Sequence, residues 1–172
     1  YQGQCNCAYW HGIFGGLYLN HLRTALYEKL IAAETVLDGL AHKDDRWVHC
    51  ERLDFDADGN EDAVLENARL ALAFNPADGG TLFEWDYKAK PFNFANTLAR
   101  REEAYHELLH AGRVQAGETA EGAQSIHDLV RVKEPGLEDY LVYDPYRRTC
   151  LRDHFLAPDA RARDLWAGTY AE

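Results

Sequence analysis

The sequence predicts an α+β fold. It indicates one long amphipathic N-terminal helix, then a mostly antiparallel and partial β-sandwich, with a short helix near residues 99–110. Two observations support this. Apolar residues recur at helical spacing through the first forty residues, and the pattern changes to an alternation of two after residue 46. With 47% hydrophobic and 27% charged residues, the 172-residue chain has the composition of a globular protein.

The first element is a helix between Leu17 and Leu40. Its apolar residues fall at positions 19, 22, 26, 30, 33, 37 and 40, which places them on one helix face. Gly39 and the polar residues 41–45 end the helix. Because isolated helices are only marginally stable in water, we expect the apolar face to pack on the rest of the chain or on another copy.

The later elements are strands. Side chains alternate over residues 47–55 and 70–74, and Phe83, Trp85 and Tyr87 are expected on one side of a third strand. Residues 129–132 and 140–143 flank a turn sequence at 134–136, which predicts a hairpin.

Charge and composition exclude several classes of partner. The net charge of -11 argues against a nucleic acid or an anionic membrane surface. No apolar run approaches the roughly 20 residues of a membrane span, and no signal peptide is recognisable. We therefore expect a cytoplasmic protein that binds neither nucleic acid nor membrane.

The chain has four cysteines, which are Cys5, Cys7, Cys50 and Cys150. In a reducing compartment we expect free thiols. A zinc site at Cys5, Cys7 and His11 is the alternative, although the usual second pair of ligands is not evident.

The segment ahead of the helix is rich in polar, aromatic and glycine residues. It reads Gln4-Cys5-Asn6-Cys7-Ala8-Tyr9-Trp10-His11-Gly12, followed by Ile13-Phe14-Gly15-Gly16. Tyr9 and Trp10 offer flat ring faces, while Asn6 and His11 offer hydrogen-bonding groups, so the segment could hold a sugar. A buried aromatic plug before the helix is the alternative.

A second polar segment, residues 54–62, contains four aspartates within nine residues. Hard cations need several oxygen ligands, and a glycine-tightened loop lets alternate side chains converge. The EF-hand pattern is incomplete, since Leu65 stands at its twelfth position. The candidate calcium ligands are Asp54, Asp56, Asp58, Asn60 and Asp62. The alternative is a solvated acidic turn between two strands.

Other acids are expected at the surface, namely Glu84, Asp86, Asp128 and Asp144.

The first of these segments resembles the fifth conserved region of glycoside hydrolase family 57, in its 4-α-glucanotransferase and α-amylase branch. The resemblance continues through Asp54-Phe55-Asp56-Ala57-Asp58-Gly59 and reaches about residue 158. Further matching blocks lie at residues 83–87, 100–107, 125–128, 140–144 and 153–156.

This resemblance implies a division of the chain and a set of site residues. Residues 1–43 would be a substrate-lining loop and helix from the end of the catalytic region, and residues 44–172 the start of the C-terminal β-sandwich domain. Trp10 would stack on a sugar, with Asn6, Tyr9 and His11 as companions. Both catalytic carboxylates of the family lie in a barrel ahead of this segment, so the resemblance assigns no catalytic residue here. The lack of methionine and the start at Tyr1 also lead us to expect a fragment.

The leading hypothesis is a piece of a retaining α-glucan-active enzyme, either a 4-α-glucanotransferase or an α-amylase, that is inactive alone. Its expected partners are an α-1,4-glucan or maltooligosaccharide and the catalytic barrel of the same parent chain. No cofactor is required, while a structural calcium ion and a homodimer are left open. The alternatives are a non-catalytic carbohydrate-binding or assembly module and a structural domain stabilised by calcium.

Overall fold

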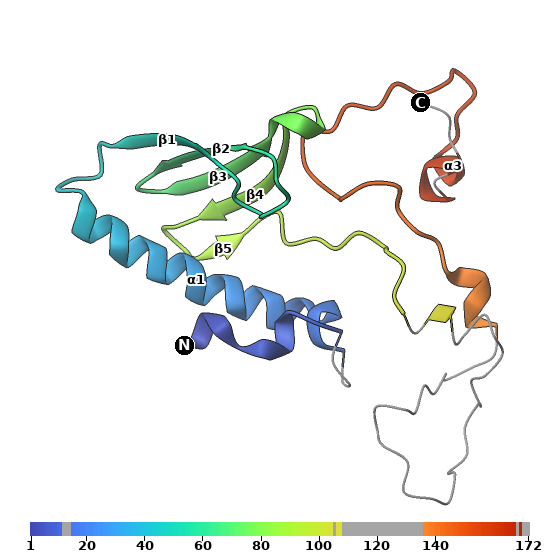
Figure 1. Cartoon of the computed structure of the whole chain (residues 1–172), viewed down its shortest axis with the longest axis horizontal. Helices are drawn as coiled ribbons and strands as arrows, with labels where there is room; N and C mark the ends of the chain where they lie inside the picture. Colours follow the sequence, from blue (N-terminus) through green and yellow to red (C-terminus); the bar gives the residue numbers. More distant parts are fainter. Residues whose placement is uncertain (12–14, 105, 108–135, 168, 170–172) are drawn as a thin grey trace, which may run out of the picture. The chain divides into compact units, whose positions relative to one another are not determined.

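The computed structural model of the chain describes residues 1–11, 15–104, 106–107, 136–167 and 169 (Figure 1). The chain divides into two compact units. The first comprises Tyr1–Leu98 with Arg148–His154, and the second comprises Ala99–Arg147 with Phe155–Glu172.

The first unit begins with short helical turns and one long helix. Three 3-10 turns, η1 (Gln2–Gln4), η2 (Asn6–Ala8) and η3 (Gly16–Tyr18), precede helix α1 (Asn20–Ala41). The predicted helix is thus confirmed. Leu26 and Ile31 are buried on it, whereas Leu37 and Leu40 of the predicted apolar face are 64% and 81% exposed. Among the described residues, only part of that face is therefore covered.

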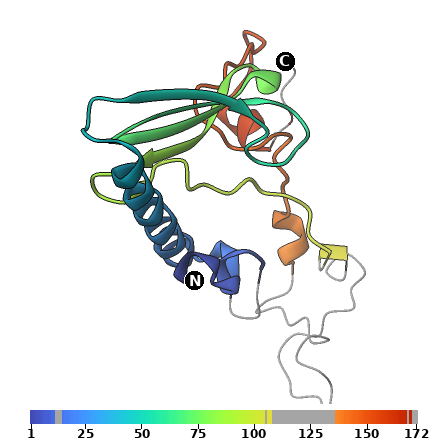
Figure 2. The same cartoon turned by 60° about the vertical axis from the view of Figure 1, so that its left-hand side comes forward.

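An antiparallel sheet follows α1 in the same unit. Its five strands lie in the order β1-β2-β3-β4-β5, and every neighbouring pair is antiparallel. Figures 1 and 2 show α1 passing beside β5. The prediction of an α+β fold is confirmed. The strands of the described residues form one sheet. The strands are β1 (Val48–Leu53), β2 (Asp62–Asn67), β3 (Leu70–Asn75), β4 (Thr81–Tyr87) and β5 (Phe92–Asn93), with a turn η4 (Pro76–Asp78) before β4.

A bulge in β4 decides which residues form the core of the sheet. Ala73 pairs with Glu84 but Phe74 pairs with Leu82, so Phe83 is the extra residue on β4. Phe83 is 4% exposed and packs with Val64 and Ala73, whereas Trp85 is 37% exposed. The prediction that Phe83 shares a side with Trp85 and Tyr87 is therefore wrong, because the bulge turns Phe83 onto the buried face.

The second unit contains the turn η5 (Leu137–Tyr140) and the short helix α3 (Ala162–Ala167). Of the helix expected near residues 99–110, His106 and Glu107 are helical, while 105 and 108–110 lie outside the described residues. The predicted strand at 140–143 is wrong, since Tyr140 ends η5 and residues 141–143 have no regular structure. Its predicted partner at 129–132, and Asp128, lie outside the described residues.

Candidate functional site

The segment of residues 5–11, called the aromatic loop below, presents its rings to solvent. Tyr9 is 58% exposed and Trp10 is 39% exposed. The Tyr9 hydroxyl donates a hydrogen bond to the Gly3 carbonyl over 2.8 Å. The rings of Trp10 and His11 lie edge to face, with centroids 5.1 Å apart. Their exposure favours a contact surface over the alternative of a buried plug.

Asn6 is also exposed in this loop, and its carbonyl accepts a hydrogen bond from the Tyr9 amide over 3.0 Å. Its side chain is therefore presented on the same turn that carries Tyr9. The structure thus places all four predicted substrate-binding residues, Asn6, Tyr9, Trp10 and His11, within one exposed loop.

A close backbone approach holds the aromatic loop on the start of α1. The Leu17 amide donates to the Trp10 carbonyl over 2.8 Å, and Leu17 is buried. Gly16 has a φ of 46°, and a Cβ there would overlap the Trp10 carbonyl oxygen. Only glycine fits this crossing without strain. The backbone crossing at Gly16 therefore holds the loop close to the start of α1.

The junction with α1 is also braced from a distant part of the first unit. Arg23 of α1 donates to the Leu17 carbonyl and, over 2.7 Å, to the side-chain oxygen of Asn96. The Asn96 amide in turn donates to Thr24 over 3.2 Å. The loop, the helix and the segment after β5 are thus connected by hydrogen bonds.

The four cysteines are free. Cys5 and Cys7 both line an apolar cavity of about 330 Å³, together with Leu22 and Leu26 of α1. Among the described residues, Asp54, Asp56 and Asp58 form the single group whose ligand atoms lie close enough together to hold a metal ion, so the zinc alternative gains no support there.

The predicted calcium loop joins β1 to β2, and three of its five predicted ligands converge. Asp54, Asp56 and Asp58 each offer a carboxylate oxygen, and these oxygens lie within 4.8 Å of one another. Asp54 also accepts hydrogen bonds from the amides of Asp58 and Gly59, each over 3.0 Å. This exposed group has the oxygen chemistry that calcium prefers.

The other two predicted ligands lie outside that group. The backbone amide of Asn60 donates a hydrogen bond to the Asp58 carboxylate over 2.7 Å. Asp62 is 0% exposed, and one of its oxygens accepts the Phe55 amide over 3.0 Å while the other lacks a partner among the described residues. Asp62 therefore closes the loop from the β2 side. Calcium binding stays a prediction.

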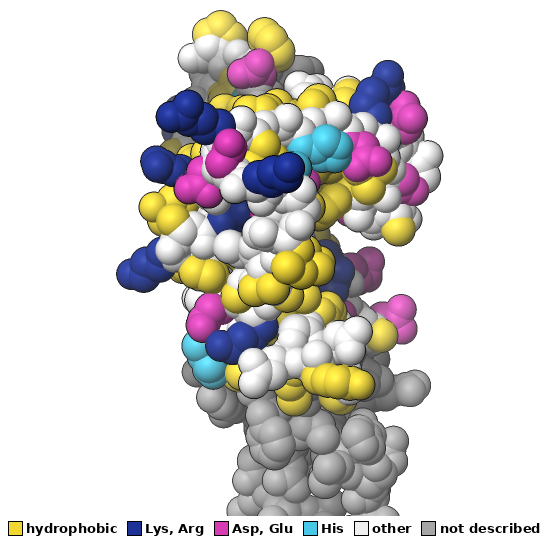
Figure 3. Space-filling view, turned by 90° about the vertical axis from the view of Figure 1, so that its left-hand side faces the viewer, with side chains coloured by type: hydrophobic (Ala, Val, Ile, Leu, Met, Phe, Trp, Pro, Cys, Tyr) yellow, Lys and Arg dark blue, Asp and Glu magenta, His cyan; other side chains and the backbone are white. Residues whose placement is uncertain are grey.

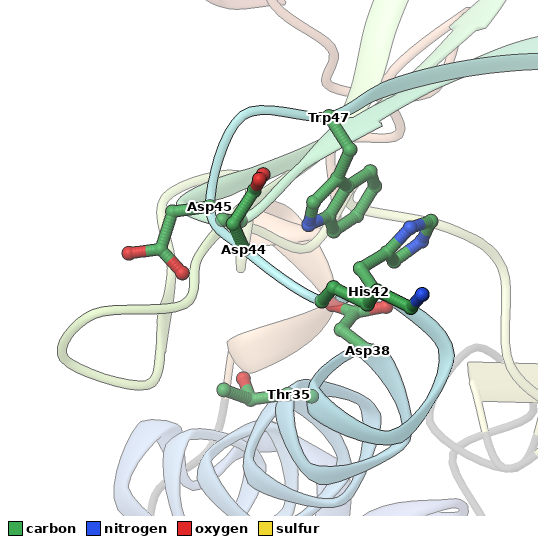
Figure 4. A pocket seen from close by; sticks show the side chains of 9 residues that line it. Thr35, Asp38, His42, Asp44, Asp45 and Trp47 are labelled. Carbon is green, nitrogen blue, oxygen red and sulfur yellow. The ribbon is translucent and has the colours of Figure 1, made fainter.

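A second cavity of about 330 Å³ lies where α1 turns into β1 (Figure 4). The His42 ring stacks on Trp47 with centroids 4.0 Å apart. Asp38 pairs with Lys88, and Asp44 accepts the Arg46 amide over 2.8 Å. Several groups that could hold a ligand there are thus engaged within the chain.

Two acids expected at the surface are buried instead. Asp86 is 6% exposed and accepts a hydrogen bond from the Asn93 amide over 2.8 Å. The Asp144 side chain is 7% exposed and pairs with Arg100 over 2.6 Å. The surface prediction is wrong because each carboxylate has a polar partner on another segment, which is Asn93 of β5 for Asp86 and Arg100 for Asp144. Asp86 and Asp144 therefore contribute to the stability of the fold, and neither belongs to the aromatic loop or to the predicted calcium loop.

The surface charge is mixed rather than uniformly basic on the face seen in Figure 3. There, Lys and Arg side chains are interspersed with Asp and Glu, over the end of the first unit where α1 meets β1. Within the described ranges, none of the helices combines the length and apolar character that crossing a membrane requires.

Comparison with known proteins identifies the family. The family model for the C-terminal domain of alpha-amylase/4-alpha-glucanotransferase matches residues 54–172, and the model for the middle domain matches residues 1–37. The chain belongs to the alpha-amylase/4-alpha-glucanotransferase family. The resemblance to glycoside hydrolase family 57 is thereby confirmed. The division predicted at residues 43 and 44 stays a prediction.

Individual relatives agree with this membership. The chain is 44% identical to alpha-amylase 1 of Dictyoglomus thermophilum over 166 residues, which are 96% of the chain and 23% of the relative. It is 39% identical to the 4-alpha-glucanotransferase of Thermococcus kodakarensis, over 99% of the chain and 24% of the relative. The crystal structure of the 4-alpha-glucanotransferase from Thermococcus litoralis matches with a TM-score of 0.73 and 32% identity, covering 98% of the chain and 23% of that structure. The chain thus spans about a quarter of the length of these relatives.

Proposed function

We propose that the chain is part of a retaining α-glucan-active enzyme, in which the aromatic loop lines the substrate cleft. The observation that carries this proposal is the exposure of Trp10 and Tyr9 on a loop whose backbone is fixed by Gly16 and Leu17. A rigid, exposed ring can stack on the C–H face of a sugar with little loss of conformational entropy. Relatives named as alpha-amylase and 4-alpha-glucanotransferase align along nearly the whole chain.

The rest of the first unit acts as the support of this loop in the proposal. Arg23 connects the loop to Asn96, and Lys88 connects α1 to the sheet. The two catalytic carboxylates would come from the barrel of the same parent chain. An α-1,4-glucan or maltooligosaccharide is the proposed substrate. Cytoplasmic location and the homodimer left open above stay predictions.

The test uses Trp10→Ala and Trp10→Phe in the complete enzyme that carries this chain. Removal of the ring should cost about 1–3 kcal/mol of stacking, by analogy with other aromatic platforms. Trp10→Phe retains a ring and should recover much of the loss. Kinetics with maltooligosaccharides should show a raised KM or a shifted product-length profile, with unchanged circular dichroism. Unchanged kinetics in folded Trp10→Ala would contradict the proposal.

Comparison of the isolated chain with the complete protein separates the proposal from the alternative of a binding module. Incubation of the chain with maltooligosaccharides should give no products by chromatography, because both catalytic carboxylates are proposed to lie elsewhere. Sustained product formation would contradict the non-catalytic role. Tight binding of maltooligosaccharides by the isolated chain, with an inactive complete protein, would favour the carbohydrate-binding module.

A further inference from the structure

A buried cluster of charged side chains connects α1 to the sheet. Lys88, directly after β4, has a fully buried side chain. Its ammonium lies 3.0 Å from Glu34 and 2.8 Å from Asp38, both on α1, and 3.4 Å from Glu66 on β2. It also lies 5.4 Å from the centre of the Trp47 ring. One ammonium thus holds a helix and a strand that are far apart in the sequence.

The charges of this cluster do not balance when all its groups are ionised. One ammonium faces three carboxylates, which leaves two negative charges among partly buried side chains around a fully buried lysine. Burial disfavours this arrangement, and protonation of one carboxyl relieves it. A protonated carboxyl can then donate a hydrogen bond to a neighbouring carboxylate. The placement of three carboxylates around one ammonium therefore favours uptake of a proton by one of them.

The acid strengths of the two glutamates support the same conclusion. Burial, helped by a hydrogen bond with Glu66, raises the pKa of Glu34 to about 7, although Lys88 opposes the rise. The same hydrogen bond is the main cause that lowers the pKa of Glu66. Burial acts to lower the pKa of Lys88, but hydrogen bonds to Asp38 and Glu34 outweigh it and the pKa is raised. Glu34 is thus the carboxyl of this cluster whose protonation is favoured, and the raised pKa of Lys88 favours its charged form.

Other titratable groups also face this cluster. His49 of β1 lies 3.7 Å from Glu66, and His42 stacks on Trp47. On β4, burial raises the pKa of Asp86, and Glu84 accepts a hydrogen bond from Asn93 over 2.8 Å. Because the imidazole of His49 lies beside Glu66, a His49 variant serves as a separate control.

We propose that Lys88, Glu34, Asp38 and Glu66 form a proton-sensitive latch that holds α1 on the sheet, tighter in mild acid than in mild alkali. With Glu34 neutral, the cluster carries one net negative charge and a carboxyl–carboxylate hydrogen bond. Loss of that proton adds a second net negative charge and removes the bond. Because α1 also carries the aromatic loop, the latch sets how firmly that loop is attached to the sheet.

The sign of the pH effect follows from linkage. The pKa of Glu34 rises from an ordinary 4.5 to about 7 in the folded chain. A carboxyl with a raised pKa contributes stability that is full below its unfolded value and is lost as pH rises through its folded value. The latch should therefore weaken between about pH 5 and about pH 8.

The experiment measures melting temperature against pH for the chain and for three variants. Glu34→Gln imitates the protonated carboxyl permanently. Glu28→Gln is the matched control on α1, because Glu28 is exposed and pairs with Lys29. His49→Gln removes the imidazole beside Glu66. Infrared spectroscopy of the unaltered chain adds a direct readout, since a protonated carboxylic acid has its own carbonyl band.

The proposal expects a melting temperature that falls as pH rises through neutrality, with that fall at least about halved in Glu34→Gln. Glu28→Gln and His49→Gln should keep most of this fall in melting temperature. A carboxylic-acid band should persist at about pH 6, lose intensity by about pH 8, and be weaker at about pH 6 in Glu34→Gln, where the buried Asp86 carboxyl is the remaining contributor. An unchanged pH dependence in folded Glu34→Gln overturns the latch. If that variant fails to fold, the infrared titration of the unaltered chain decides, and a missing band at about pH 6 overturns it equally.

Discussion

The ammonium of Lys88 lies 2.8 Å from the carboxylate of Asp38, which precedes it by fifty residues. This contact joins the last turns of α1 to the residue that follows β4. Since the Lys88 side chain is fully buried, its charge is stabilised by its carboxylate partners rather than by water. The position of α1 on the sheet thus depends on an ion pair as well as on apolar packing.

Removal of the Lys88 charge should destabilise the chain strongly. In Lys88→Met the methylene packing is largely kept, but three carboxylates lose their common cation. We expect a loss of about 2–4 kcal/mol in the free energy of unfolding, below the full value for a buried pair because the carboxylates are partly exposed. Urea denaturation measures it. Lys90→Met is the control, since Lys90 is exposed and should change stability by less than about 0.5 kcal/mol. Equal stability of both variants would contradict the role of Lys88.

Gly16 should be irreplaceable in the attachment of the aromatic loop. A Cβ at this position would overlap the Trp10 carbonyl oxygen and lie 2.6 Å from the His11 carbonyl carbon, with a φ of 46°. Since both neighbours are backbone atoms, Gly16→Ala should cost at least about 2 kcal/mol and expose residues 1–19 to protease. Gly39→Ala is the opposite case. Nothing lies within 4 Å of a Cβ there, so the helix should gain about 0.5–1 kcal/mol. Normal stability and protease resistance of Gly16→Ala would show that the crossing is not tight.

Asp144 should act as the structural centre of the second unit. Its carboxylate accepts hydrogen bonds from the Arg100 guanidinium over 2.6 and 3.0 Å and from the Arg100 amide over 2.7 Å. Asp144→Asn removes the charge and one acceptor oxygen, so we expect a loss of about 1.5–3 kcal/mol, reduced because Arg100 is partly exposed. Limited proteolysis with mass spectrometry should show faster cleavage within the second unit. The exposed Asp139→Asn should leave the cleavage pattern unchanged, and an identical pattern in Asp144→Asn would contradict the prediction.

The regular elements could be predicted from periodicity, because their causes are local. The helical spacing of leucines anticipated α1, and the alternation of two anticipated β1, β3 and β4. β2 was missed because Asp62–Asn67 begins and ends with polar residues that a loop would also carry. The inward turn of Phe83 was missed for another reason. A bulge depends on the pairing of two strands, and alternation within one strand does not report it.

The candidate sites divide in the same way. The aromatic loop could be found from a continuous motif, and the acidic loop from aspartates and a glycine in one turn. The charged cluster around Lys88 could not be predicted from a motif, because its partners lie 22 to 54 residues away on separate elements and no regular spacing connects them. The burial of Asp144 has a similar cause, because Arg100 lies 44 residues away. The partner of Asp86 is only seven residues away, but their contact depends on the pairing of β4 with β5. Buried ion pairs are tertiary features, and a single sequence carries little trace of them.

Calcium should stabilise the chain by binding to the predicted calcium loop, residues 54–62. If calcium binds the carboxylates of Asp54, Asp56 and Asp58, the folded state is stabilised by mass action, by about 2.7 kcal/mol at one hundred times the Kd. The melting temperature should therefore rise with calcium and fall with chelator. Magnesium should substitute poorly, because it demands a tighter octahedral shell than a flexible loop provides.

Two kinds of substitution distinguish calcium binding by the aspartates from their structural role in the loop. Asp56→Asn with Asp58→Asn should abolish the calcium response and leave the calcium-free chain about as stable or slightly more stable, because repulsion between carboxylates is relieved. Asp54→Asn should also destabilise the calcium-free chain, since the Asp54 carboxylate accepts the amides of Asp58 and Gly59. Thermal unfolding with added calcium, magnesium or chelator distinguishes these outcomes. A melting temperature indifferent to calcium and chelator would favour the solvated turn, and the structure of the loop would then rest on its hydrogen bonds alone.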